Sequence, residues 1–155
     1  TARFFKEIGG YEELGRGPLS PSAIAAWGLA PEAGGEYLLL RAPMGGDFGH
    51  VRLVSFDNAG RRVPMRPGAR AWDTGCHFSM MIRVKDMRSI YDDAIRLGWW
   101  TETPITALRF GESDLRVVIY RGPDGVQVQT YDRLSPPLPE AIPDFERMTA
   151  PFNMM

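Results

Sequence analysis

The second half of the chain alternates apolar and polar residues in four short stretches, and a fifth stretch has helical spacing. Side chains of a strand point alternately to its two faces, so a period of two predicts a strand, whereas apolar residues three or four positions apart predict a helix. Asp86 stands where a helix N-cap is expected. We therefore predict the order β-α-β-β-β over 77–133. The strands are expected at 78–84, 105–110, 115–121 and 126–132, and the helix at 87–97.

The first half has a similar order of elements but lacks a strand at its start. Residues 2–9 predict a short helix, which Gly9-Gly10 ends because glycine accepts the left-handed conformation common after helices. Ser20-Pro21 is a typical start for a second helix within 18–27. The first half therefore looks like the same module with an inserted helix and without its opening strand. Its strands are expected at 36–42 and 50–57.

The end of the chain repeats a segment of its middle. Residues 151–155 (PFNMM) match residues 77–81 (HFSMM), with Phe, Met and Met in register. The last strands of the two halves, 51–57 and 126–132, also align. Recurrence at a fixed offset indicates a modular architecture. We predict a first, incomplete module with a connector over 1–75, a second module over 76–134, and a linker with the start of a further module strand over 135–155.

Composition narrows the classes of protein that the chain can represent. It has 155 residues, of which 44% are hydrophobic and 24% are charged, which is typical of a globular protein. The net charge of −1 makes nucleic acid an unexpected partner, and the sequence has no apolar run long enough for a membrane helix. The single Cys76 excludes an internal disulfide and a zinc site built from cysteines. A cytoplasmic location is expected.

Three features of the second half point to a known family. His77 opens the first strand, Asp86 precedes the helix, and the turn Gly122-Pro123-Asp124-Gly125 leads into the strand that carries Gln129. The chain resembles the vicinal oxygen chelate superfamily, which includes glyoxalase I, the bleomycin-resistance proteins and the extradiol dioxygenases. The resemblance implies an α+β fold of paired β-α-β-β-β modules that form an open, cupped, mixed sheet.

The resemblance also implies a metal site, of which this sequence supplies only a part. In the metal-binding members, a His from a module's first strand and a Glu from its last strand hold a divalent ion that contacts two neighbouring oxygens of the substrate. His77 occupies the first position, and Gln129 stands where Glu is usual. Val54 aligns with Gln129 and Pro151 with His77, so the first module offers no ligand. Iron, manganese, nickel or zinc is the expected cofactor, at an incomplete site. Alternatively, His77 is a strand-entry histidine that is hydrogen-bonded to backbone.

Four further residues are candidates for binding a substrate. Gln127 and Tyr131 share a strand face with Gln129, and Arg52 aligns with Gln127 and would suit a carboxylate or phenolate. Trp99 follows the helix next to Trp100, where it would line a hydrophobic mouth. Each has a structural alternative. The glutamine row could face solvent on an edge strand, Arg52 could be an exposed strand arginine, and one of the two tryptophans could belong to the core.

Three functions remain open at this point. The first is a glyoxalase- or dioxygenase-like enzyme that acts through a divalent metal on a small aromatic or oxygen-rich metabolite. The second is a binding protein of the bleomycin-resistance type, which needs no metal. In the third, the chain is half of a longer four-module protein and serves as scaffold. The missing opening strand leaves a free sheet edge, so we expect a dimer, with the tail strand pairing into the gap within the chain or across a partner.

Overall fold

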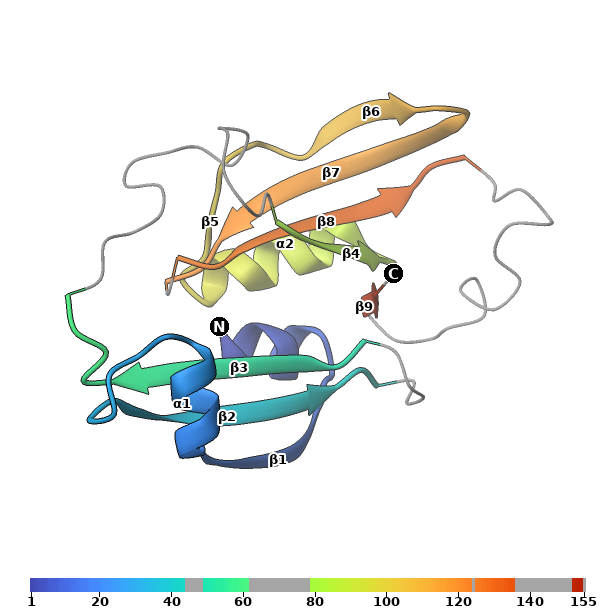
Figure 1. Ribbon diagram of the computed structural model, residues 1–155. Coiled ribbons are helices and arrows are strands. Elements are labelled where there is room, and N and C mark those ends of the chain that lie inside the picture. Colours follow the sequence, from blue (N-terminus) through green and yellow to red (C-terminus); the bar gives the residue numbers. More distant parts are fainter. Residues whose placement is uncertain (44–48, 62–78, 124, 136–151, 155) are drawn as a thin grey trace.

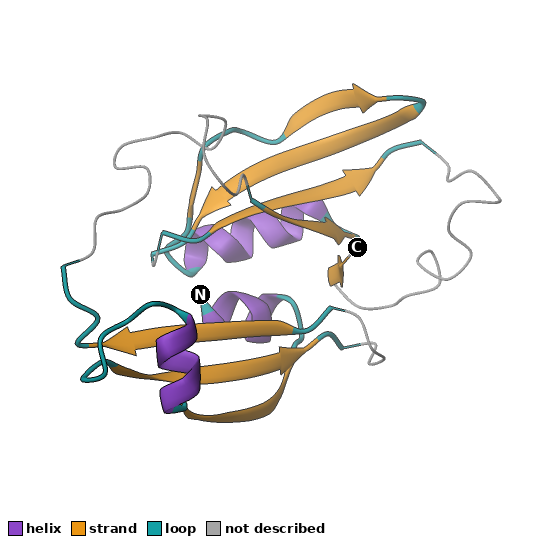
Figure 2. Cartoon of the chain, viewed as in Figure 1, coloured by secondary structure: helices purple, strands orange, loops and turns teal. Residues whose placement is uncertain are grey.

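The computed structural model describes residues 1–43, 49–61, 79–123, 125–135 and 152–154. Its strands form a three-stranded sheet and a six-stranded sheet, with helices packed against them (Figure 1, Figure 2). The predicted α+β class, with paired modules and an open mixed sheet, is confirmed. Among these residues, no helix has the length and apolar character needed to cross a membrane.

The first sheet is antiparallel, in the order β1-β2-β3. The helical turn η1 precedes it, and the inserted helix α1 separates its first two strands, so this half of the chain opens with a helix as predicted. The elements are η1 (Phe4–Ile8), β1 (Glu12–Pro18), α1 (Pro21–Ala26), β2 (Gly34–Arg41) and β3 (Val51–Asp57).

The second sheet has the order β5-β7-β8-β4-β9, with β6 also paired to β7. Strand β4 runs parallel to β8, and the other pairs are antiparallel, as expected for a β-α-β-β-β module. The elements are β4 (Met80–Val84), α2 (Met87–Arg96), β5 (Trp100–Thr101), β6 (Thr106–Phe110), β7 (Ser113–Arg121), β8 (Gln127–Arg133) and β9 (Phe152–Met154).

Both predicted helix starts are confirmed by their caps. The Asp86 carboxylate accepts hydrogen bonds from the backbone N–H groups of Arg88 at 3.0 Å and Ser89 at 3.1 Å. The Ser20 hydroxyl accepts one from the backbone N–H of Ala23 at 3.2 Å, and Pro21 is the first residue of α1. These side chains satisfy N–H groups that have no partner inside the helix.

Strand β1 was not predicted, because its residues lack the alternation of apolar and polar side chains. Its sequence is EELGRGP, and none of its residues is buried. The strand exists because it pairs with β2, and the register shifts between Glu13 and Gly15. Long-range pairing therefore determines the structure here, against a weak local preference.

One hydrophobic core joins the two halves of the chain, and we call it the common core. Phe4 and Phe5 of η1 are fully buried. The Phe4 ring lies 4.3 Å from the Trp99 ring and 6.2 Å from the Tyr120 ring, between ring centroids. Both sheets and α2 contribute further side chains, namely Leu40, Val51, Ile82, Val84, Met87, Ile90, Ala94, Val118 and Val128. Each sheet therefore has a face toward the common core and a face away from it, which we call the outer face.

The tail of the chain forms strand β9 on the free edge of β4. Met154 pairs with Ile82, Asn153 with Arg83, and Phe152 with Val84, in antiparallel register. In Figure 1, β9 lies between β4 and the first sheet. The sequence repeat makes β9 the counterpart of β4, so two equivalent strands pair side by side. The tail therefore pairs within the chain, with β4 of the second sheet, and among the described residues it forms no ladder with the first sheet; the expected dimer stays a prediction.

Removing the tail strand should destabilise the second sheet. Deletion of residues 152–155 exposes the edge of β4, and each lost ladder hydrogen bond contributes roughly 0.5–1.5 kcal/mol net. We expect a lower melting temperature by circular dichroism and a tendency to associate through the exposed edge, measured by light scattering. An unchanged melting temperature together with an unchanged mass would contradict a stabilising role for β9.

The turn before β8 should not tolerate a side chain at Gly122. A Cβ atom there would lie 2.8 Å from the ring of Trp99, which is held in the common core. We expect Gly122→Ala to lower the free energy of unfolding by about 1–3 kcal/mol, as overpacking does. Urea denaturation measures this. Gly15→Ala is the control, because a Cβ atom at Gly15 meets nothing within 4 Å; equal effects of the two substitutions would contradict the clash.

Candidate ligand-binding site

Strand β8 presents its two sets of side chains to different surroundings. Val128 and Thr130 are fully buried, and the Thr130 hydroxyl lies 3.3 Å from the sulfur of Met87 in α2, to which it donates a hydrogen bond. These residues therefore face the common core. Because strand side chains alternate, Gln127, Gln129 and Tyr131 point to the outer face.

The neighbouring strands surround these side chains with two arginines, one of which is Arg121 of β7 opposite Gln127, and with several apolar groups. Gln129 is paired with Met81 of β4 on one side and with Ile119 of β7 on the other. Tyr131 is paired with Arg83 of β4. Residues directly opposite in a ladder share a face, so Arg83 belongs to the same surface. We call Arg83, Gln127, Gln129 and Tyr131 the polar row.

The electrostatics of the polar row are dominated by arginine. Burial raises the pKa of the Tyr131 phenol, and the nearby charges of Arg83 and Arg133 partly offset this. Tyr131 is only 6% exposed, so its hydroxyl is a neutral hydrogen-bonding group at neutral pH. The Arg133 guanidinium also donates a hydrogen bond to the Ser113 hydroxyl at 3.1 Å. The surface around Tyr131 thus favours negative charge on a ligand.

The arginine at the end of β7 is held by its neighbours in the protein. Arg121 forms an ion pair of 2.7 Å with Glu102, whose side chain is 4% exposed. The Arg121 guanidinium also lies over the Trp100 ring, 5.3 Å from its centroid. The Glu102 carboxylate is therefore engaged by a cation.

Solved structures share this architecture. A glyoxalase family protein from Bacillus cereus superposes with a TM-score of 0.68 at 21% sequence identity, over 85% of this chain and 83% of that chain. The chain therefore shares its fold with a glyoxalase family protein. The protein SMU.1112c superposes with a TM-score of 0.50 at 16% identity, over 83% of this chain and 85% of that chain. At such identities the likeness concerns the fold alone. No protein-family model and no curated protein sequence matches the chain.

The part of the site that the structure describes fits a divalent metal poorly. His77, the expected ligand from the first strand, lies outside the described residues. Gln129 has a thioether and an aliphatic side chain as its neighbours across the ladder. In the described ranges, no three His, Cys, Asp or Glu side chains come together. The Arg83 charge near Tyr131 further disfavours a cation. Vicinal oxygen chelate chemistry with a metal would therefore need donors beyond these.

The structure separates two predicted substrate contacts from the polar row. Trp99 is 3% exposed and packs in the common core, whereas Trp100 is 51% exposed. Arg52 lies on β3, in the other sheet, and its guanidinium stands 4.8 Å from the centroid of the Tyr37 ring. Neither side chain lies in the polar row. Of the two tryptophans, Trp99 belongs to the core and Trp100 to the surface, which is the alternative considered from the sequence.

Sequence reasoning missed Arg83 and Met81, although a signal for them was present. The predicted module implies that its first and last strands are neighbours. Ile82 and Val84 were the apolar positions of the first strand, so Met81 and Arg83 had to share the other face with Gln129 and Tyr131. The exact partners needed the register between β4 and β8, which the sequence does not supply.

The charge of Arg83 should be measurable in the titration of Tyr131. Because this cation lowers the pKa of the phenol, Arg83→Gln should raise the pKa of Tyr131 further. Carbon-13 NMR of labelled tyrosine rings, assigned with Tyr131→Phe, measures it. Because the pKa of Tyr131 is raised in the folded protein, its contribution to stability is fully present below the unfolded-state pKa of about 10. This contribution is lost as pH rises through the pKa of the folded state. A Tyr131 pKa that is unchanged or lower in Arg83→Gln would contradict the arrangement.

Proposed function

We propose that this chain is a small-molecule-binding protein with the vicinal oxygen chelate fold, whose polar row binds an anionic, oxygen-rich aromatic compound. The observation that supports it most directly is the placement of Arg83 beside Tyr131, with Gln129 next in the row. The ligand class follows from the charge and hydrogen-bonding capacity of these groups. This is the binding-protein alternative that the sequence left open.

The polar row offers complementary groups for a carboxylate or phenolate. A guanidinium binds such an anion through charge-assisted hydrogen bonds, each contributing roughly 1.5–3 kcal/mol. The Gln127 and Gln129 amides can donate to or accept from further ligand oxygens. Met81, Val117 and Ile119 flank these groups across the ladders and supply apolar contact for a ring. Specific sites for small molecules combine apolar walls with a few polar groups in this way.

Binding is favoured over turnover because the polar row lacks a general acid or base suited to neutral pH. Amides do not titrate, and an arginine stays protonated. Burial raises the pKa of Tyr131, which makes the phenol a poor base near neutrality. Glu102 is engaged by Arg121. These side chains can orient and neutralise a ligand, but they do not move a proton readily.

A metal-dependent enzyme of the glyoxalase or dioxygenase type is the second candidate, and the fold supports it. In that case His77 and Gln129 are the ligands that this chain contributes. The ion would supply Lewis acidity toward two neighbouring oxygens of the substrate. Further donors would have to come from residues outside the described ranges or from a partner chain.

The binding proposal predicts a charge-dependent affinity for salicylate, which carries a carboxylate and a phenol on one ring. We expect saturable binding by isothermal titration calorimetry, and a roughly ten- to hundredfold weaker affinity in Arg83→Gln, equivalent to one charge-assisted hydrogen bond. Gln129→Glu should weaken binding as well, because it adds a negative charge to the row.

The matched control for this experiment is Arg88→Gln, on helix α2. Arg88 is ion-paired with Asp92 and its side chain is 70% exposed, so the substitution removes the same charge at a different place. We expect wild-type affinity from it. An equal loss of salicylate affinity in Arg83→Gln and Arg88→Gln would show that only the overall charge of the protein matters. The absence of any saturable binding of salicylate would contradict the proposal.

Metal content distinguishes the two candidates. Elemental analysis of the purified protein, with His77→Ala in parallel, is expected to show no stoichiometric divalent ion that depends on His77. A near-stoichiometric ion that disappears in His77→Ala would establish the enzyme candidate instead. Activity assays would then begin with catechols and 2-oxoaldehyde adducts.

A further inference from the structure

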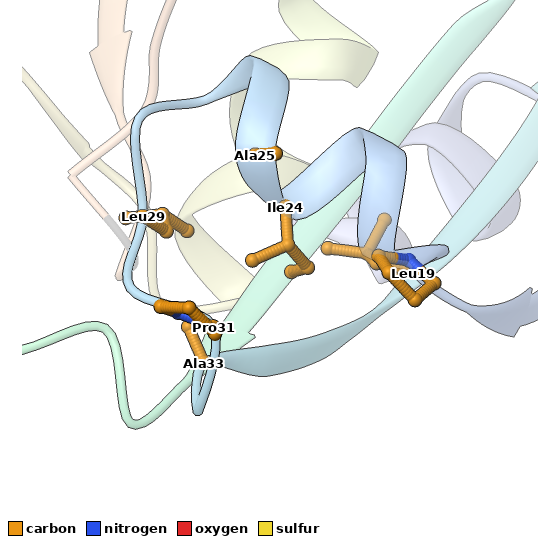
Figure 3. A pocket seen from close by; sticks show the side chains of 7 residues that line it. Leu19, Ile24, Ala25, Leu29, Pro31 and Ala33 are labelled. Carbon is orange, nitrogen blue, oxygen red and sulfur yellow. The ribbon is translucent and has the colours of Figure 1, made fainter.

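A small cavity lies on the outer face of the first sheet, under helix α1. Its volume is about 210 Å³. Figure 3 shows Ile24 of α1 in its centre, with Leu19 on one side and Leu29, Pro31 and Ala33 on the other. All lining side chains are apolar, namely Leu19, Pro21, Ile24, Ala25, Leu29, Pro31 and Ala33.

The chain around the cavity is fixed by prolines and by backbone hydrogen bonds. Pro21 begins α1 and Pro31 lies in the loop that returns to β2, and each restricts its backbone. The Leu19 N–H donates a hydrogen bond to the carbonyl oxygen of Gly35 at 2.8 Å, so the two ends of the segment 19–35, which contains α1, are joined. A Cβ atom at Gly35 would lie 2.1 Å from the Ser55 carbonyl oxygen, which shows how closely the start of β2 approaches β3. These features restrict the backbone of the segment that lines the cavity.

The cavity has a buried floor and an accessible rim. Leu19, Ile24 and Ala33 are at most 8% exposed and form a small hydrophobic cluster with Val54 and Phe56 of β3 packed against it. Pro21, Ala25 and Pro31 are exposed. Satellite clusters under a loop are common and usually filled by their own side chains. At the rim, Ala25 carries only a methyl group.

We propose that this cavity is a second binding site, which takes an uncharged apolar group of the size of one aromatic ring. The lining side chains offer no donor, acceptor or charge, so an ionic group would find no side-chain partner there. Apolar cavities of about 150 Å³ bind benzene, so the volume suits a single ring. The site is independent of the polar row, because it lies on the other sheet and uses none of the same residues.

Fluorine NMR with fluorobenzene tests this site. We expect saturable line broadening with the wild-type protein. Ala25→Leu places three more carbon atoms at the rim, so it should weaken the binding at least tenfold. Ala26→Leu is the matched control, because Ala26 is the next residue of the same helix, is exposed, and does not line the cavity. It should bind fluorobenzene as the wild type does.

Two further measurements distinguish binding at this cavity from binding at the polar row. Arg83→Gln should leave fluorobenzene binding unchanged, and salicylate should not displace fluorobenzene. The inference is overturned if fluorobenzene does not bind saturably, if Ala25→Leu binds it as the wild type does, or if salicylate competes with it. Circular dichroism spectra of both leucine variants verify that they fold.

Discussion

The packing of Phe4 against Trp99 and Tyr120 is the contact on which the rest of the structure depends. Burying a phenylalanine contributes roughly 1.5–3 kcal/mol, and Phe4 and Phe5 are both fully buried. Since the helical turn that carries them contacts the second half of the chain, both sheets turn one face to the same core. Their other faces are then left for function, and both the polar row and the apolar cavity lie on them.

The alternation of side chains along β8 determines which of them point away from the common core. Val128 and Thr130 are committed to the common core, so Gln127 and Gln129 must point away from it. A slip of one residue in β8 would bury the glutamines and expose the valine, at a large cost in desolvation. The position of the polar row is therefore fixed by buried residues on the opposite face of the same strand.

The elements that could be predicted from the sequence are those with a strong local pattern. Helix α2 has apolar residues at helical spacing and Asp86 as its cap, and both are observed. Strand β1 has no such pattern and exists only through its pairing with β2. The same distinction holds for the site. The common face of Gln127 and Gln129 follows from alternation alone, whereas Arg83 joins them only through the register of a neighbouring strand, and the burial of Trp99 follows from its packing against Phe4.

The fold does not determine the charge of the ligand, because that depends on individual side chains. A carboxylate in the last strand would lower the potential of the outer face and favour a divalent cation. In this chain Gln129 stands there, Met81 and Ile119 flank it, and Arg83 lies beside the next position of the row. Under the proposed function, these side chains favour an anion over a cation, without any change in the arrangement of the backbone. The fold therefore leaves the kind of ligand open, and the side chains on the outer face of the sheet decide it.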